Sequence, residues 1–296
     1  MKNSFQYYCI RFYILQKEIK KTFSNSPINF RKIRKEDIHN PNTKFFKGPN
    51  VNRFKIVDST ITEIIKDLDN NKLLIFVPGG AFISGPTKLH WNIVEKLSKK
   101  TLQTMWVCDY PKAPEYDILD ISNNIDSIYK KALEKYDPEN IILMGDSVGA
   151  TLIMALMQRA IVNKWRIPKK LFLVCPVCDA TFQNPEITTI EKKDIMLATK
   201  GVISAKKMCA GKYELNNGMM SPIYASFTQF PKTILYLAEN DITYADQKLL
   251  VNKLANDSIS HKVYLGVAMP HIWPYLPFMP ESKKALQDII SEINKS

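Results

Sequence analysis

Short apolar runs alternate with amphipathic segments from about residue 72 to the end of the chain. Runs without polar positions are typical of strands buried on both faces, and apolar positions three and four residues apart are typical of helices packed on a sheet. The expected strands are 73–77, 104–108, 141–144, 171–175, 233–237 and 262–266. The expected helices are 90–99, 118–136, 148–164, 246–255 and 281–294. This order predicts an α/β fold with a doubly wound, mostly parallel sheet.

Two segments interrupt this alternation. Residues 1–45 have a helical and basic pattern before any expected strand, and residues 179–230 form a long insertion that is rich in Met and Tyr. Insertions of this size are usually functional, and lids are a common case. A helical addition that only completes the core is the alternative.

The composition is typical of a globular protein. The chain has 296 residues, of which 45% are hydrophobic and 24% charged, and we expect a single domain over residues 1–296. No stretch reaches the roughly 18 apolar residues that a membrane span needs. Arg11 interrupts the apolar N-terminal run and no small-residue cleavage site follows, so a signal peptide is not indicated. These features favour a cytoplasmic protein.

The net charge of +12 raises the possibility of nucleic-acid binding. The Lys and Arg residues are dispersed along the chain and accompany no recognised binding motif, so we expect solvated helix faces and no nucleic-acid partner. The charge would favour anionic surfaces or acidic substrates through long-range attraction. The basic N-terminal segment leaves three roles open, namely peripheral contact with a membrane, cover for a pocket, or contact with another subunit.

The five cysteines are too few and too scattered for a disulfide framework. Cys175 and Cys178 form a CxxC pair, but no second pair and no neighbouring His supports a redox or metal site. We therefore expect the pair to mark the buried end of the strand at 171–175.

A serine between two glycines marks the most informative position. Ser147 stands between Gly145 and Gly149, directly after the apolar run 141–143 and at the start of an expected helix. This pattern is typical of a nucleophile elbow, in which a strained turn between strand and helix exposes the hydroxyl. The pentapeptide is common by chance, so the interpretation requires a base and an acid.

Topology selects the base among the four histidines. Catalytic groups collect at the carboxyl ends of parallel strands, and in the elbow motif the acid and the His follow the Ser. His39 and His90 precede Ser147, and His261 begins a strand at the opposite edge. Only His271 follows a strand end, so we expect it to be the general base.

The same criterion selects the acid. Asp241 lies just past the end of the strand at 233–237, whereas Asp257 lies at the opposite edge. Asp246 begins the next helix, where it suits a role at the helix terminus. Asp241 is the expected partner of His271, with Glu239 and Asp246 as lesser candidates.

The segment Pro78-Gly79-Gly80-Ala81-Phe82 follows the first strong strand and suits an oxyanion hole. Small residues let backbone N–H groups face a cavity, and losing one such donor typically costs about 10²–10³ in rate. A phosphate loop is excluded because Pro86 and Thr87 stand where Lys and Ser/Thr are required. A glycine-rich tight turn without function is the alternative.

These motifs together resemble those of the hormone-sensitive-lipase-like esterases of the α/β-hydrolase fold. The resemblance covers about residues 73–294, in the family's order. Five segments of this sequence carry it: Pro78–Phe82 for HGGGF, Asp109–Glu115 for DYRLAPE, Gly145–Gly149 for GDSAG, Asp241–Asp246 for the acid motif, and His271–Pro274 for the histidine segment.

The resemblance implies Ser147 as nucleophile, His271 as base and Asp241 as acid. It also implies oxyanion donors at the N–H groups of Gly80, Ala81 and Val148. A helical cap would be built from residues 1–45 and 179–230, and no metal or cofactor would be required.

Three positions depart from the family pattern. Pro78 replaces a histidine that positions the loop, so catalysis should survive. Ala81 replaces a glycine and adds a methyl group on the alcohol side, which should reduce tolerance of bulky alcohols. Val148 replaces Ala and should narrow the site slightly.

The expected activity is hydrolysis of short acyl esters, acetyl to hexanoyl, through an acyl-enzyme. A lactonase, amidase or sugar O-deacetylase would use the same triad, and a non-enzymatic ligand-binding homologue is a further alternative. The presence of all three triad residues argues against the binder.

Overall fold

A computed structural model describes residues 3–41, 50–65, 71–101 and 103–295. Within these ranges eight strands form one sheet, in the order β1-β2-β4-β3-β5-β6-β7-β8. Strands β3 to β8 are parallel, whereas β2 runs antiparallel to both β1 and β4. The bounds are β1 Val51–Ile56, β2 Ser59–Ile64, β3 Leu73–Val77, β4 Thr104–Asp109, β5 Ile141–Asp146, β6 Lys170–Val174, β7 Lys232–Ala238 and β8 His261–Gly266. The predicted mostly parallel, doubly wound sheet is confirmed.

The hairpin of β1 and β2 was not expected from the sequence. Strand β1 has half-buried apolar residues but also exposed Asn52, Arg53 and Lys55, because it forms the edge of the sheet. By contrast, every residue of β3 and β5 is buried, which explains their continuous apolar runs.

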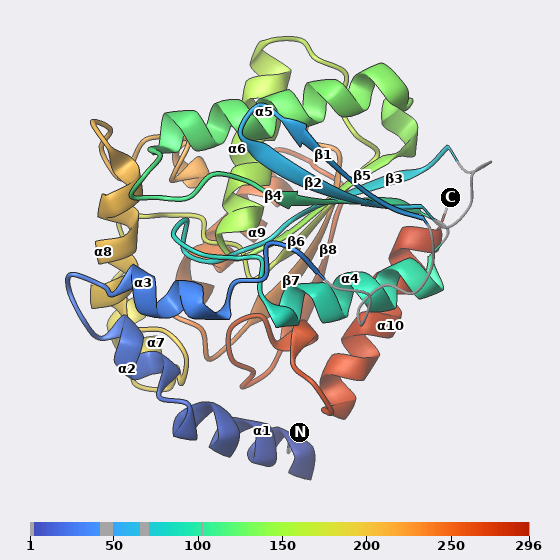
Figure 1. Cartoon of the computed structure of the whole chain (residues 1–296). Coiled ribbons are helices and arrows are strands. Elements are labelled where there is room, and N and C mark those ends of the chain that lie inside the picture. Colours follow the sequence, from blue (N-terminus) through green and yellow to red (C-terminus); the bar gives the residue numbers. More distant parts are fainter. Residues whose placement is uncertain (1–2, 42–49, 66–70, 102, 296) are drawn as a thin grey trace.

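Helices cover both faces of the sheet. In Figure 1, α5 lies above the sheet, and α4 and α10 lie below it. The α-helices are α1 Phe5–Gln16, α2 Ile19–Phe23, α3 Phe30–Ile33, α4 Lys88–Lys100, α5 Ile118–Lys135, α6 Val148–Val162, α7 Ile187–Glu191, α8 Thr199–Ala210, α9 Tyr244–Asn256 and α10 Pro280–Asn294. The 3-10 helices are η1 Arg34–Glu36, η2 Pro138–Asn140, η3 Pro222–Tyr224 and η4 Trp273–Tyr275.

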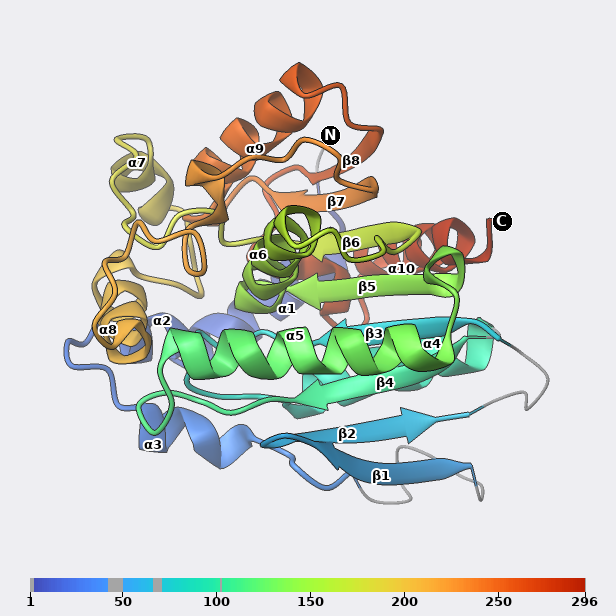
Figure 2. The ribbon, with the colours of Figure 1, turned by 90° about the horizontal axis from the view of Figure 1, so that it is seen from above.

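The strand order creates a switch point between β3 and β5. The chain passes from β3 to β4 on one side, and then crosses back over β3 to reach β5 on the other. Helices α4 and α5, which make these two connections, lie on opposite faces of the sheet, and the view from above shows the strands fanned between them (Figure 2). Ligands of open α/β sheets bind at such a point, beyond the carboxyl ends of the strands.

The N-terminal helices and the insertion after β6 pack on one another. A Cβ at Gly201 of α8 would lie 2.0 Å from the Phe23 carbonyl oxygen, so α2 and α8 touch at the backbone. The Ile28 N–H also donates to Ser204 Oγ at 3.0 Å. The assignment of 1–45 and 179–230 as cap elements of one domain stays a prediction, and positions 1–2 and 42–45 lie outside the described residues. None of the helices in the described ranges is long and apolar enough to cross a membrane.

Candidate active site

Ser147 occupies a sharp turn between β5 and α6. Its φ of 52° and ψ of −124° place a non-glycine residue in a strained region, and its N–H donates to the Val174 carbonyl at 2.9 Å. The flanking glycines permit this turn. A Cβ at Gly149 would lie 2.0 Å from the Val77 carbonyl oxygen, and one at Gly145 would lie 2.7 Å from the Gly149 carbonyl carbon. The geometry is that of a nucleophile elbow, with Ser147 half-buried at its apex.

His271 and Asp241 meet beyond the ends of β7 and β8. The Nδ1 atom of His271 lies 2.6 Å from Oδ2 of Asp241, and Oδ1 of Asp241 accepts from the Thr243 N–H at 2.9 Å. Both side chains are buried. Burial lowers the pKa of His271, but the charge and hydrogen bond of Asp241 oppose it, with help from Asp194 and Asp146, so the pKa is raised overall.

The other candidates from the sequence have different partners. Glu239 Oε2 accepts from the Ala268 N–H at 2.7 Å, and Asp246 Oδ1 accepts from the Asn184 side-chain amide at 2.9 Å. Burial raises the pKa of Asp246 to about 6. Neither carboxylate is hydrogen-bonded to the imidazole, so Asp241 is the candidate acid that the structure brings to His271.

A further carboxylate, that of Asp194 in the insertion 179–230, hydrogen-bonds to the loop that contains Asp241. Its Oδ2 accepts from the Ile242 N–H at 2.9 Å, directly after Asp241, and its Oδ1 accepts from the N–H groups of Met196 and Leu197 at 2.7 and 2.9 Å. Burial and the nearby Asp241 raise the pKa of Asp194 to about 6. Nothing in the sequence pattern pointed to this residue, because it lies in the irregular insertion.

Cys175 lies beside the His–Asp pair. Its Sγ, one ring nitrogen of His271 and one oxygen of Asp241 lie within 4.8 Å of one another, and Sγ accepts from the Ile272 N–H at 3.2 Å. Burial, together with the Asp241 charge, holds the pKa of this thiol well above its ordinary value. A protonated thiol is a poor metal ligand. Cys178 is also buried and, like Cys175, has a free thiol within the described chain.

The segment after β3 turns back against the elbow. The Gly80 carbonyl accepts from the N–H groups of Ile83 and Ser84, both at 3.0 Å, and Gly80 has a φ of 134°. A Cβ at Gly79 would lie 2.5 Å from Asp146 Oδ2 and 2.9 Å from Ser147 Cβ. The tight turn therefore touches the elbow through Gly79, and the two residues that follow, Gly80 and Ala81, are half-buried.

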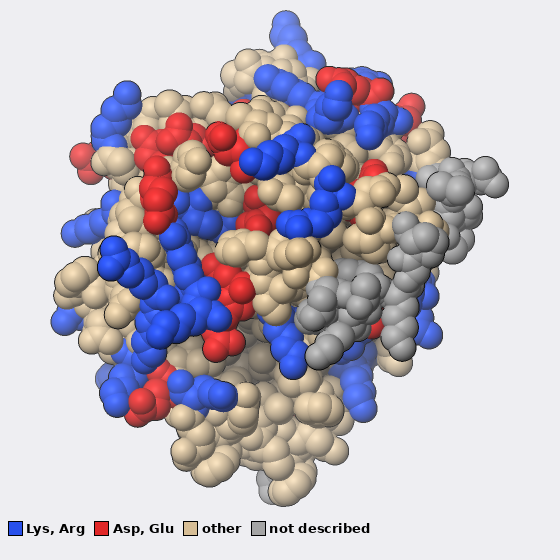
Figure 3. All heavy atoms as spheres, in the orientation of Figure 1, with Lys and Arg blue, Asp and Glu red and all other residues tan. Residues whose placement is uncertain are grey.

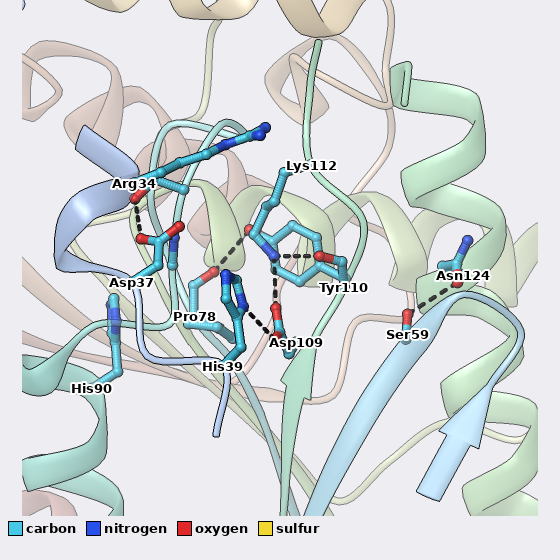
Figure 4. A network of polar contacts seen from close by, with 12 residues as sticks. Arg34, Asp37, His39, Ser59, Pro78, His90, Asp109, Tyr110, Lys112 and Asn124 are labelled. Carbon is cyan, nitrogen blue, oxygen red and sulfur yellow. Dashed lines mark hydrogen bonds and ion pairs between the residues drawn. The ribbon is translucent and has the colours of Figure 1, made fainter. Parts of the chain in front are cut away.

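The N-terminal segment braces this turn (Figure 4). Asp37 Oδ1 accepts from Ser84 Oγ at 2.7 Å and from the Gly85 N–H at 2.8 Å. Arg34 donates from Nε to the Ile83 carbonyl at 2.7 Å and also binds Glu115 through two nitrogens. These contacts could not be predicted from the sequence, because Asp37 lies 47 and 48 positions before its partners Ser84 and Gly85.

The segment after β4 holds the same turn from the other side. The Tyr110 hydroxyl donates to the Pro78 carbonyl at 2.9 Å. Asp109 lies 2.7 Å from His39 Nδ1 and 3.4 Å from Lys112 Nζ. Burial lowers the pKa of Lys112 to about 8. The Pro78 carbonyl is thus held by a hydrogen bond from Tyr110.

His90 has partners at Thr87 and at Asp146, the residue before Ser147. Its Nδ1 accepts from the Thr87 N–H at 2.9 Å, and its Nε2 lies 3.3 Å from Asp146 Oδ2. His261 instead contacts the Ile259 carbonyl at 2.8 Å, before β8 begins. Of the histidines in the described ranges, only His271 contacts Asp241, and its role as general base stays a prediction.

The family model for the alpha/beta hydrolase fold matches residues 74–274, and the chain belongs to this family. An esterase of Acinetobacter venetianus is 26% identical over 231 residues, which are 77% of this chain and 76% of that protein. Among solved structures, a putative esterase from Staphylococcus aureus has a TM-score of 0.87 at 24% identity, covering 96% of this chain and 99% of that one.

An esterase of the bacterial hormone-sensitive lipase family has a TM-score of 0.84 at 18% identity, covering 99% and 98% of the two chains. The solved structures agree in fold, and the family model together with the relatives named as esterases confirms the resemblance to hormone-sensitive-lipase-like esterases. The relatives' names also confirm the expectation of a carboxylic ester hydrolase.

Proposed function

We propose that Ser147, His271 and Asp241 form the catalytic triad of an esterase that acts on short acyl chains, acetyl to hexanoyl. The observation that carries the proposal is the 2.6 Å contact between His271 Nδ1 and Asp241 Oδ2, because it orients the imidazole. With Nδ1 engaged, Nε2 is the nitrogen left to accept the Ser147 proton.

The reaction proceeds by acyl transfer. Ser147 Oγ attacks the ester carbonyl carbon while its proton passes to His271, and the carbonyl oxygen becomes an oxyanion. His271 then returns the proton to the departing alcohol. Water attacks the acyl-enzyme, gives its proton to His271, and the acid leaves as Ser147 is restored. Asp241 stabilises the charged imidazole in both steps.

The N–H groups of Gly80, Ala81 and Val148 are the proposed oxyanion donors. Contact between Gly79 and the elbow supports this role, because it brings the turn to within van der Waals reach of Ser147. The bracing by Asp37 and Tyr110 fixes the turn before substrate arrives, as preorganised donors require.

Hydrolysis of a series of 4-nitrophenyl esters tests the proposal. The purified protein should hydrolyse the acetate, butyrate and hexanoate and show much lower kcat/KM on long-chain esters. Ser147→Ala should abolish turnover, whereas Ser226→Ala, at an exposed serine in a turn, should leave it unchanged. Absence of turnover on every ester would overturn the proposal, and a preference for lactones, amides or acetylated sugars would replace the substrate class alone.

A further inference from the structure

Helix α1 is apolar on both of its sides. Its inner side packs on the protein through buried Tyr7 and Ile14 and half-buried Ile10. The Tyr7 hydroxyl donates to the Ala268 carbonyl at 3.0 Å, and Ser4 donates from N and Oγ to Glu281 at 2.7 and 2.8 Å. The helix is therefore fixed in place.

The outer side of α1 carries large apolar side chains that are largely exposed to solvent. Phe5, Tyr8, Phe12 and Leu15 follow a helical spacing of three and four residues, so they share one side. Their exposed fractions are 79%, 53%, 64% and 45%. In Figure 3 the lower edge of the molecule, where Figure 1 draws α1, shows a broad area without charged atoms. We call these four side chains the α1 apolar stripe.

Exposed basic residues accompany the stripe. By helical spacing Arg11 lies at one border between the outer and inner sides, and Lys17 directly follows the last residue of the helix. Helix α1 contains no acidic residue. Helices with exposed aromatic residues and flanking cations are typical of segments that lie in the interface of an anionic bilayer.

A second copy of the chain fits this surface less well. Two stripes placed face to face would bring the Arg11 cations of both copies together without an acid on α1 to pair with them. The net charge of +12 on each chain adds to this repulsion. Anionic lipid headgroups supply the opposite charge.

We propose that the α1 apolar stripe docks on the surface of an anionic lipid bilayer. Tyr7 binds Ala268 from the inner side of α1, so docking would hold the loop that contains Ala268 and His271 one helix diameter (~10 Å) behind the bilayer surface. The inference stands on α1 alone and does not depend on the proposed ester hydrolysis.

Cys9 provides a direct probe. It is the exposed member of five cysteines that all lie in the described chain, and it belongs to the outward part of α1. An environment-sensitive fluorophore on Cys9 should shift to shorter wavelength with vesicles of phosphatidylcholine and phosphatidylglycerol. The shift should be weaker with phosphatidylcholine alone and should decrease as salt is added.

Matched variants distinguish binding through the α1 apolar stripe from non-specific binding through other exposed apolar residues. The double change Phe5→Gln and Phe12→Gln should reduce partitioning onto the anionic vesicles at least about tenfold, because two aromatic side chains lose their apolar contact. Val162→Gln, at a residue that is 79% exposed at the end of α6, should have no effect. Circular dichroism checks that each variant is folded.

Three results would overturn the proposal. The wild-type protein could fail to bind anionic vesicles, or the double variant could bind as well as the wild type. Light scattering could instead show that the wild type and Val162→Gln are dimers and the double variant is a monomer, which would assign the stripe to contact with a second copy of the chain.

Discussion

Oδ1 of Asp37 accepts a hydrogen bond from the Gly85 N–H at 2.8 Å and so ties the N-terminal segment to the turn that begins at Gly80. The two residues are 48 positions apart in the chain. The same oxygen accepts from Ser84 Oγ, which gives the turn two anchors on one carboxylate. Because two of the three proposed oxyanion donors, the N–H groups of Gly80 and Ala81, lie in this turn, the contact gives the N-terminal segment a role in positioning them.

Asp37→Ala should therefore lower kcat with little change in KM. Loss of the anchor loosens donors that act mainly in the transition state, and we expect a decrease of about tenfold, less than the 10²–10³ for losing a donor outright. Steady-state kinetics on 4-nitrophenyl butyrate measure the split. An equal rise in KM with unchanged kcat would contradict the positioning role. Glu36→Ala, at the exposed neighbouring position, is the control.

The pH profile should report the raised pKa of His271. The imidazole must be neutral to accept the Ser147 proton, so kcat/KM should fall on the acid side with a midpoint above the ordinary 6.5. Asp241→Asn removes the charge that raises the pKa, so the midpoint should move to lower pH. The rate should also fall by up to about 10⁴. A midpoint that does not move in Asp241→Asn would show that another group controls the profile.

Lys206 should reduce stability near neutral pH. Its Nζ is buried without a hydrogen-bond partner in the described chain and lies 4.2 Å from the centre of the Phe82 ring. Burial lowers its pKa from 10.5 to about 7. The unfolded chain therefore binds the Lys206 proton more tightly than the folded protein does. The free energy of unfolding consequently decreases as the pH falls from 10.5 to about 7, and the loss is constant at lower pH.

Lys206→Met should accordingly raise the free energy of unfolding most at pH 7 and below, by up to about 5 kcal/mol, and much less near pH 10. Urea unfolding at the two pH values measures the difference. Lys207→Met, at the exposed neighbour on the same helix, should change little at either pH. A gain for Lys206→Met that is independent of pH would contradict the charge argument.

Ala81→Gly should widen the alcohol side of the proposed site. Ala81 has a φ of 55°, is half-buried, and lies two residues after Gly79, which contacts the elbow. Removing its methyl group should raise kcat/KM on tertiary-alcohol esters several-fold relative to ethyl esters. The ratio of the two values for wild type and variant is the measurement, and an unchanged ratio would show that Ala81 does not limit the alcohol.

The sequence allowed the central sheet to be predicted because its strands are buried on both faces. The runs at 73–77 and 141–144 lack polar positions, and they appear as the fully buried β3 and β5. Strand β1 was missed because an edge strand with Asn52, Arg53 and Lys55 exposed has no such run.

The sequence allowed prediction of those candidate residues that follow strand ends. It did not allow prediction of residues that reach the site through contacts between distant segments. His271 and Asp241 follow strand ends, and the structure brings them together. Asp194 and Asp37 act through backbone N–H groups of distant segments, a contact that leaves no spacing or motif in the chain. Only the folded arrangement reveals them.

Labelling by a fluorophosphonate, followed by mass spectrometry of the peptides, tests the nucleophile most directly. The probe should add to the peptide that contains Ser147, and Ser147→Ala should abolish the adduct while Ser226→Ala retains it. Labelling should also be slowed in Asp241→Asn, since the imidazole is then less able to accept the proton. An adduct on a different serine, or no adduct on the folded wild-type protein, would contradict the assignment of Ser147.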